Sequence, residues 1–405
     1  MLKQSEQKNF IYWSFISLFI YTLLLELPIL NISPSNFFFL LYISLSFLLV
    51  LYFRNYWKRD IPPFALITFN LLLVCNLIAI VRAIVSTSNY LDWKHTLVNE
   101  DGGISLLVPF AMVSSFHFIN NKKLLQLCIN IFKYSFFLIP IALAFSTESY
   151  PRMVTPVIVF IILSPYFKEK ERFIILTVAV ISVAIAISWR TNVLHILISF
   201  SLLMVYYLRK WASASLLTVV HLCLFLIPLY FLNQGINGDS IFSRMKNSEY
   251  SIKTNGEEIE FTADTRTALY EEVFKDLNVT NSLWLGKGST GKYKTEYDYD
   301  LLAEMGNERS SVEVGFLRIL INTGILGFVL YTILLLIAVF YGTFRTKNTL
   351  SKLLALLVAS HWAMLFIEEA TVYNLYYYFT WIVVGLCFSR EFRNLSDDQL
   401  KEWLR

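Results

Sequence analysis

Three arginines stand where the chain passes between polar and apolar sequence, and each could bind an anion. Arg190 lies in a short polar corner between two apolar stretches, Arg266 in the first turn of a helix predicted over 265–277, and Arg318 near the start of a long apolar block. A guanidinium matches phosphate oxygens with two parallel hydrogen bonds, and a helix start also favours anions. The alternatives are a tolerated surface charge at Arg190 and a solvent-exposed ion pair at Arg266.

Glu313 is the carboxylate immediately before the apolar block Gly315–Gly327. A carboxylate within hydrogen-bond reach of a hydroxyl can take its proton, so Glu313 is the candidate general base. The alternative is an ordinary interfacial charge beside Arg309 or Arg318.

Two further carboxylates, Glu368 and Glu369, stand at the end of an apolar stretch, close in sequence to Tyr373 and Tyr377. The tyrosines could form an interfacial aromatic belt. Together with the two carboxylates, they could instead line the mouth of a cleft and stack on sugar rings. We keep both interpretations.

One glycine-rich stretch resembles the sequence motif of a nucleotide-binding loop. Residues 286–293, Gly-Lys-Gly-Ser-Thr-Gly-Lys-Tyr, nearly fit the pattern G-x-x-x-x-G-K-[ST], but Tyr293 stands where the magnesium-binding hydroxyl belongs. A βαβ context is also missing, so we predict a tight turn that needs glycine conformations. We find no metal-ligand spacing in this region and expect neither a metal nor another cofactor.

The composition indicates an all-α polytopic membrane protein. Of the 405 residues 56% are hydrophobic and only 16% are charged, whereas soluble domains are about a quarter charged. The net charge of +4 is spread over loops and gives no reason to expect nucleic-acid binding. The four cysteines all fall inside apolar blocks, as expected for small packed residues.

We predict about twelve transmembrane helices from blocks long enough to cross a bilayer. They cover residues 10–30, 36–53, 62–86, 103–119, 124–146, 151–167, 173–189, 192–208, 213–232, 314–342, 351–369 and 372–389. One set of short connections, with the termini, holds nineteen Lys and Arg, and the other set holds three. The positive-inside rule therefore predicts cytoplasmic termini.

The domain organisation follows from this topology. Residues 1–232 form helices 1–9, 233–312 form a large external loop, 313–389 form helices 10–12, and 390–405 form a cytoplasmic tail. The loop carries fourteen Asp or Glu and nine Lys or Arg, so an anion site there must rely on particular arginines and not on a basic field.

Three features together resemble the superfamily of O-antigen polymerases and O-antigen ligases. They are Arg266 followed by Leu269-Tyr270 and Leu285-Gly286-Lys287-Gly288; the block Glu313–Gly327 with Leu317, Leu320, Gly324 and Gly327; and Arg190-Thr191 at an outer corner. These motifs cover about seventy residues. Ligases carry a histidine-asparagine pair where this chain has Glu313-Val314, so the resemblance favours the Wzy-type polymerase.

The resemblance implies a GT-C-like membrane glycosyltransferase of the bacterial inner membrane, working in lipopolysaccharide biosynthesis. It implies an undecaprenyl-pyrophosphate-linked oligosaccharide as substrate, joined into polysaccharide at the periplasmic face, with membrane lipids and a chain-length regulator as partners. We then expect Arg190, Arg266 and Arg318 to stabilise the leaving pyrophosphate in place of a metal, with Glu313 as base. The alternatives are an O-antigen ligase acting on lipid A-core, a lipid-linked oligosaccharide flippase or transporter, and an assembly protein without activity.

Overall fold

The computed structural model describes residues 61–88, 102–115, 154–185, 190–208, 214–236, 251–254, 257–260, 266–295, 308–309 and 312–404, with single positions between 89 and 101. The spans predicted at 10–30, 36–53 and 124–146 lie outside these residues, as does the tail end at Arg405. The structure therefore tests the predicted fold over the remaining spans and the outer loop.

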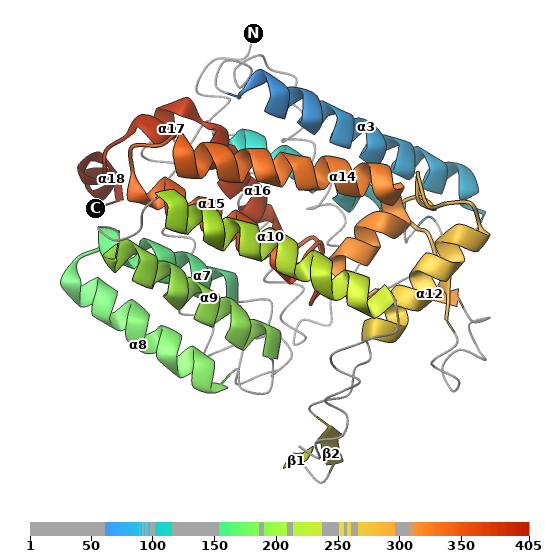
Figure 1. The fold of residues 1–405 in the computed structure, drawn as a ribbon, viewed down its shortest axis with the longest axis horizontal. Helices are drawn as coiled ribbons and strands as arrows, with labels where there is room; N and C mark the ends of the chain where they lie inside the picture. The colour runs from blue at the N-terminus through green and yellow to red at the C-terminus, as the bar shows by residue number, and fades with distance from the viewer. Residues whose placement is uncertain are drawn as a thin grey trace.

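The described part is helical, with two short antiparallel strand pairs (Figure 1). The helices are α3 (Pro63–Ser86), η3 (Gly103–Ser114), α7 (Val154–Leu163), η6 (Ser164–Tyr166), α8 (Glu169–Ile185), α9 (Arg190–Tyr207), α10 (Ala214–Ile236), α12 (Arg266–Val279), α14 (Gly315–Phe344), α15 (Thr349–Met364), α16 (Leu375–Phe388), α17 (Arg390–Asn394) and α18 (Asp397–Leu404). The strand pairs are β1 (Ser251–Thr254) with β2 (Glu257–Glu260), and β3 (Tyr293–Lys294) with β4 (Glu308–Arg309).

Helix α14 is the centre of the bundle. It packs along α3 on one side and against α15 and α16 on the other. Helices α7, α8 and α9 form a group at the lower left of Figure 1, and α9 packs against α15. Large side chains such as Trp362 and Trp381 are fully buried where these helices meet. The outward faces of α3, α8 and α10 keep large apolar side chains exposed, for example Phe64 and Phe173, as expected of surfaces that contact lipid.

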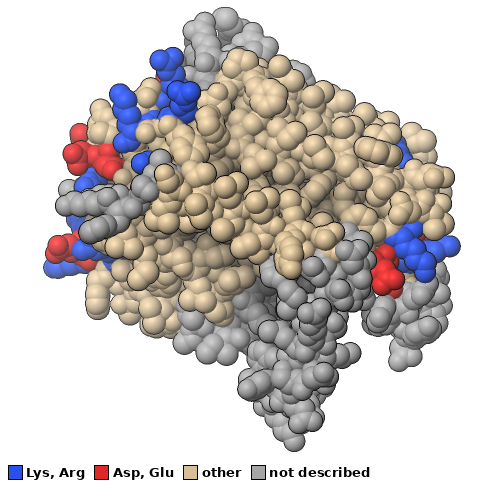
Figure 2. Space-filling model, in the orientation of Figure 1, with Lys and Arg blue, Asp and Glu red and all other residues tan. Residues whose placement is uncertain are grey.

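Charged side chains gather at the two ends of the molecule (Figure 2). One group lies where α17 and α18 are and another lies near α12. On the face shown, the described residues between the two groups present a broad surface without charges. Two described helices, α3 and α14, are long and apolar enough to cross a bilayer, and five shorter apolar helices accompany them. This arrangement agrees with a membrane protein, whereas the number of twelve spans stays a prediction.

The observed boundaries differ most from the predicted ones at α15. The predicted span 351–369 ends at Met364 in the structure, so Glu368 and Glu369 lie in the connection to α16 and not in a helix. Helix α9 begins at Arg190, two residues before the predicted 192, and α12 covers 266–279 where 265–277 was predicted. A connection offers unpaired backbone groups that a helix does not, which is important for the site below.

Helix α14 is interrupted at Gly324, whose φ of 68° and ψ of −170° are not helical. A Cβ at this position would lie 2.3 Å from the carbonyl carbon and oxygen of Trp284, so only glycine fits. The interruption separates a first half, Gly315–Thr323, from the longer second half of the helix.

The glycine-rich turn supplies the hydrogen bonds that this interruption removes. Lys287 N–H donates to the Ile321 carbonyl at 2.6 Å, and Ile325 N–H donates to the Leu283 carbonyl at 2.9 Å. Backbone groups in a membrane must be satisfied within the protein, so the turn allows α14 to be broken there.

The same turn is tied to α3 and to α12. Arg82 Nη1 donates to the carbonyls of Leu285 at 3.0 Å and Gly286 at 2.8 Å. The Lys287 ammonium pairs with Asp276 of α12 and donates to the Lys292 carbonyl at 2.9 Å, so this side chain closes the turn and ties it to the outer-loop helix.

Candidate functional site

Several elements meet at the connection between α15 and α16, residues 365–374. This connection lies at the end of the bundle nearest to the outer loop. The first turn of α14 is bonded to it: Gly315 N–H donates to the Glu368 carbonyl at 2.9 Å, and Phe316 N–H donates to the Leu365 carbonyl at 3.0 Å. Free N–H groups at a helix start thus meet free carbonyls that follow a helix end. The start of α14 is therefore fixed to the α15–α16 connection.

Helix α12 of the outer loop is bonded to the same connection. The Tyr270 hydroxyl donates to the Phe366 carbonyl at 2.7 Å, and the Tyr270 ring packs on Phe316 with 5.3 Å between ring centroids. Leu269, Tyr270, Val273 and Leu277 recur at helical spacing and are buried, so they form the face by which this helix packs. This contact holds the helix that begins at Arg266 against the membrane-embedded helices.

Arg318 and Glu369 form an ion pair in the interior. Arg318 Nε donates to Glu369 Oε1 at 3.2 Å, and the Arg318 side chain is only 2% exposed while that of Glu369 is 21% exposed. A buried guanidinium needs such a partner because desolvation of an isolated charge is costly. One edge of Arg318 is thus occupied by a carboxylate from the connection.

The neighbouring carboxylate, Glu368, is paired with a different helix. Its Oε1 contacts Nε2 of His195 in α9, and both side chains are largely buried. The ring of Tyr376 packs against His195 with 4.7 Å between centroids. Consecutive glutamates therefore contact α9 and α14.

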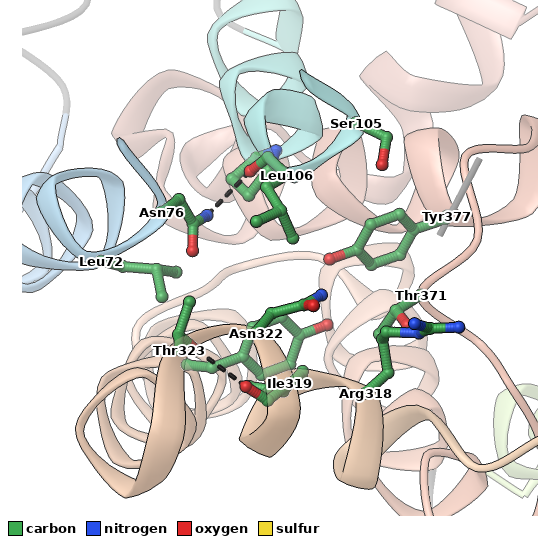
Figure 3. A pocket seen from close by; sticks show the side chains of 12 residues that line it. Leu72, Asn76, Ser105, Leu106, Arg318, Ile319, Asn322, Thr323, Thr371 and Tyr377 are labelled. Atoms are coloured by element: carbon green, nitrogen blue, oxygen red, sulfur yellow. Dashed lines mark hydrogen bonds between the residues drawn. The ribbon is translucent and has the colours of Figure 1, made fainter. Parts of the chain in front are cut away.

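A small polar cavity lies beside Arg318, between α3, η3, α14 and α16 (Figure 3). Its volume is about 30 Å³, enough for one or two water molecules. Its polar lining includes side chains from all of these elements, and in Figure 3 the Tyr377 hydroxyl points into it opposite Asn76. The polar and charged residues that line it are Asn76, Ser105, Arg318, Asn322, Thr323, Tyr331, Thr371 and Tyr377.

Glu313 lies outside this cavity, on the exposed side of the same region. Its side chain is 57% exposed, and Arg309 Nη2 of β4 donates to its Oε1 at 3.3 Å. The residues on either side of it, Val312 and Val314, are fully buried. The carboxylate is therefore presented to the outer loop end, just before the chain enters α14.

Tyr293 of β3 is a neighbour that the sequence did not single out for the site. It is 1% exposed and pairs in register with Arg309. Burial raises the pKa of its phenol to about 12, and the charges of Arg309 and Arg318 act against this while those of Glu272 and Glu313 add to it. Tyr293 thus stays a neutral phenol, within electrostatic range of both Glu313 and Arg318.

Of the other predicted site residues, Arg190 and Arg266 are the first residues of α9 and α12, and their side chains lie outside the described part. Tyr373 is fully buried and Tyr377 lines the cavity, so neither presents an exposed ring face in this structure. Within the described residues, no three His, Cys, Asp or Glu side chains are grouped closely enough to hold a metal ion.

These features define the class of the protein: a helical membrane protein with a polar site at the outer-loop end of its bundle, built from a broken helix and an ion-paired connection. Residues 175–332 match the family model of O-antigen ligase. This match confirms the predicted relationship to the superfamily of O-antigen ligases and polymerases. No curated protein and no solved structure matches the chain.

Proposed function

We propose that the protein is an O-antigen polymerase, a membrane glycosyltransferase that joins undecaprenyl-pyrophosphate-linked repeat units into polysaccharide. The family match supports a ligase- or polymerase-type membrane protein acting on lipid-linked oligosaccharides. In our proposal the enzyme lies in the bacterial inner membrane with both termini in the cytoplasm, and the end that carries α12 faces the periplasm. A chain-length regulator is its proposed protein partner.

The observation that carries the proposal is the convergence of three helices on the α15–α16 connection. Helix α9 begins at Arg190, α12 begins at Arg266, and α14 contains Arg318; each of these helices contacts the connection through a polar side chain. Their convergence supports one shared site for the pyrophosphate. The proposed contacts are Arg190 and Arg266, with Arg318 as a weaker third because Glu369 already binds it.

The proposed reaction needs charge stabilisation and a proton acceptor. The acceptor hydroxyl oxygen attacks the anomeric carbon of the donor sugar, a new glycosidic C–O bond forms, and the bond to the lipid pyrophosphate breaks. The pyrophosphate leaves with the electron pair, and the arginines stabilise its charge without a metal. The hydroxyl proton passes to the Glu313 carboxylate, whose exposure leaves it open to a polymer in the periplasm.

Glu313 is also the residue that favours a polymerase over a ligase. In the resembling ligases a histidine-asparagine pair takes the place of Glu313-Val314. Polymer transfer to lipid A-core is the second candidate function, and it uses the same donor. A flippase would need the same lipid-linked oligosaccharide but no proton acceptor. The sugar path of the proposed enzyme is predicted to be lined by Glu368, Glu369, Tyr373 and Tyr377. The two tyrosines are buried, so they would contact sugar only after a rearrangement that exposes them.

The glycolipids of cells that lack this chain distinguish these functions. Lipid A-core with a single repeat indicates a polymerase, polymer left on the lipid carrier indicates a ligase, and loss of outward-facing repeats indicates a flippase. Either of the last two results would overturn the proposal.

Variants then test the residues. Arg190→Ala and Arg266→Ala should abolish polymer at normal protein level, and lysine should restore it only in part because it lacks the planar fork. Glu313→Gln should slow the reaction by about a hundred- to ten-thousand-fold with near-normal donor affinity. Glu308→Gln is the matched control, an exposed carboxylate in the adjacent strand β4. Parent-like rates in Glu313→Gln would place the base elsewhere.

A further inference from the structure

The pair formed by His195 and Glu368 links α9 to the α15–α16 connection. His195 is 7% exposed, and its Nε2 contacts the Glu368 carboxylate, whose side chain is 19% exposed. Ser199 and Ser201, two other polar residues of α9, donate their hydroxyls to carbonyls of α9 itself, at 2.9 Å each. The histidine therefore makes a polar contact across helices that these serines do not make.

This link is continued through the bundle by aromatic and polar contacts. Tyr376 packs on His195 at 4.7 Å and on His361 at 5.7 Å between ring centroids. His361 Nε2 is hydrogen-bonded to the Tyr331 hydroxyl of α14 at 2.9 Å. A continuous set of contacts thus runs from α9 through α16 and α15 to α14, the helix that carries Arg318.

The link lies close to the start of α9. His195 follows Arg190 by five residues, which is about 7.5 Å along a helix axis. A helix transmits position over so short a distance, so fixing His195 fixes where the helix begins. On the other side of the connection, Glu369 fixes α14 through Arg318.

We propose that His195 and Glu368 are positioning residues that hold the start of α9, and with it Arg190, beside α14 for binding the donor pyrophosphate. The inference rests on the proposed function for the ligand it names. The two carboxylates of one connection then set the spacing between two arginine-bearing helices. The pair acts through its hydrogen bond and takes no proton from the acceptor.

The test compares two substitutions of one histidine. His195→Gln keeps a side-chain N–H that can donate to Glu368, and His195→Leu keeps bulk but removes the donor. Initial rates of the purified full-length protein in lipid nanodiscs are measured over a range of lipid-linked repeat concentrations. His195→Leu should raise the donor KM about tenfold or more with a smaller change in kcat, because a lost hydrogen bond to a charged group is worth about one such factor. His195→Gln should restore most of the donor affinity.

His221 provides a matched control. It is a 6% exposed histidine of α10 whose Nδ1 is bonded to the Leu217 carbonyl of its own helix. Its Nε2 contacts the Thr343 hydroxyl at 3.4 Å, in the last turn of α14 and not at the α15–α16 connection. His221→Leu should leave the donor KM unchanged. An unchanged KM in His195→Leu would overturn the proposal. A loss of kcat in His195→Gln as large as in His195→Leu would also overturn it, because that pattern indicates a proton-transfer role, which glutamine cannot fill.

A distance measurement separates this inference from the proposed function. Spin labels at Leu197 in α9 and Ile367 in the connection, both partly exposed, report the spacing of the two elements in a cysteine-free protein. His195→Leu should broaden that distance distribution, whereas His195→Gln and His221→Leu should not. If the parent protein transfers no sugar, the proposed function fails and this measurement still decides whether the pair positions α9. An unchanged distribution in His195→Leu would refute the positioning role.

Discussion

Two ion pairs of the site region have nearly the same geometry but different surroundings, and their energies should differ accordingly. Arg318 and Glu369 are 3.2 Å apart with side chains 2% and 21% exposed, and Arg309 and Glu313 are 3.3 Å apart with side chains 31% and 57% exposed. Distance and chemistry are therefore matched, and desolvation is the variable. In each pair the arginine is replaced by methionine and the glutamate by glutamine, first singly and then both together.

The expected magnitudes follow from Coulomb's law. At 3.2 Å and an effective dielectric constant of about 20, the buried pair attracts by about 5 kcal/mol. Since Glu369 is partly exposed, we expect a coupling energy of about 2–4 kcal/mol. At 3.3 Å in bulk water the same law gives about 1 kcal/mol, and salt reduces it further, so the exposed pair should couple by about 0.5 kcal/mol or less.

The assay is a double-mutant cycle on the free energy of unfolding, measured by titrating the purified protein with a denaturing detergent. Denaturant titration is preferred to melting temperature, because one kcal/mol shifts the melting point of a chain of 405 residues by only a few degrees or less. The single variant Arg318→Met should also destabilise more than Arg309→Met, because it leaves the largely desolvated Glu369 carboxylate without this partner. Coupling energies that are equal in the two cycles, or a value below about 0.5 kcal/mol for Arg318 with Glu369, would refute the reasoning.

The remaining predictions concern topology, metal dependence and the helix break. Cysteines introduced at Ser251 and Ser396 should differ in labelling by an impermeant thiol reagent on intact spheroplasts; labelling of the tail but not of the loop would reverse the orientation. Polymerisation by purified protein should persist in excess chelator; loss in EDTA with recovery on adding magnesium would direct attention to Asp298, Asp300 and Glu304, which lie outside the described residues. Gly324→Ala should destabilise the protein by about 3 kcal/mol or more, because it combines a disfavoured backbone conformation with a 2.3 Å contact to the Trp284 carbonyl; a parent-like unfolding curve would show that the break can close.

Composition and helical periodicity predicted much of the described fold. The observed α3 and α14 agree with the predicted spans 62–86 and 314–342 to within about two residues, because both are long apolar helices. The helix predicted over 265–277 is observed as α12, and its buried residues Leu269, Val273 and Leu277 recur at helical spacing. Such signals are local and need no knowledge of the neighbours.

The interruption of α14 could not be predicted in this way. Gly324 sits in a continuous apolar block, and what makes it non-helical is a turn nearly forty residues earlier that bonds to the opened backbone. The hairpin of β1 and β2 had a local signal that was not used: Asn255-Gly256 stands between the two strands, the commonest sequence of a two-residue hairpin.

The sequence named several residues of the candidate site but did not show how they are arranged. Arg318, Glu368, Glu369 and Tyr377 were all candidates, but the sequence could not show that each glutamate would pair with a different helix. His195 was one of several polar residues in predicted spans, where a single histidine is usually a packing residue. His195 and Glu368 are 173 positions apart, so no local sequence pattern could predict their contact.

The end of α15 at Met364 explains why the site is assembled at this connection. A helix end leaves carbonyls without intrahelical partners, and a helix start leaves N–H groups without them. Here the carbonyls of Leu365 and Glu368 accept from the start of α14, and that of Phe366 accepts from Tyr270. The Glu369 carboxylate lies against Arg318 in the first turn of α14, at the positive end of the helix dipole, which favours negative charge there. Had α15 continued to residue 369 as the sequence suggested, the Leu365 carbonyl would have accepted a hydrogen bond within the helix, and the start of α14 would have lost one of the two carbonyls that hold it to the connection.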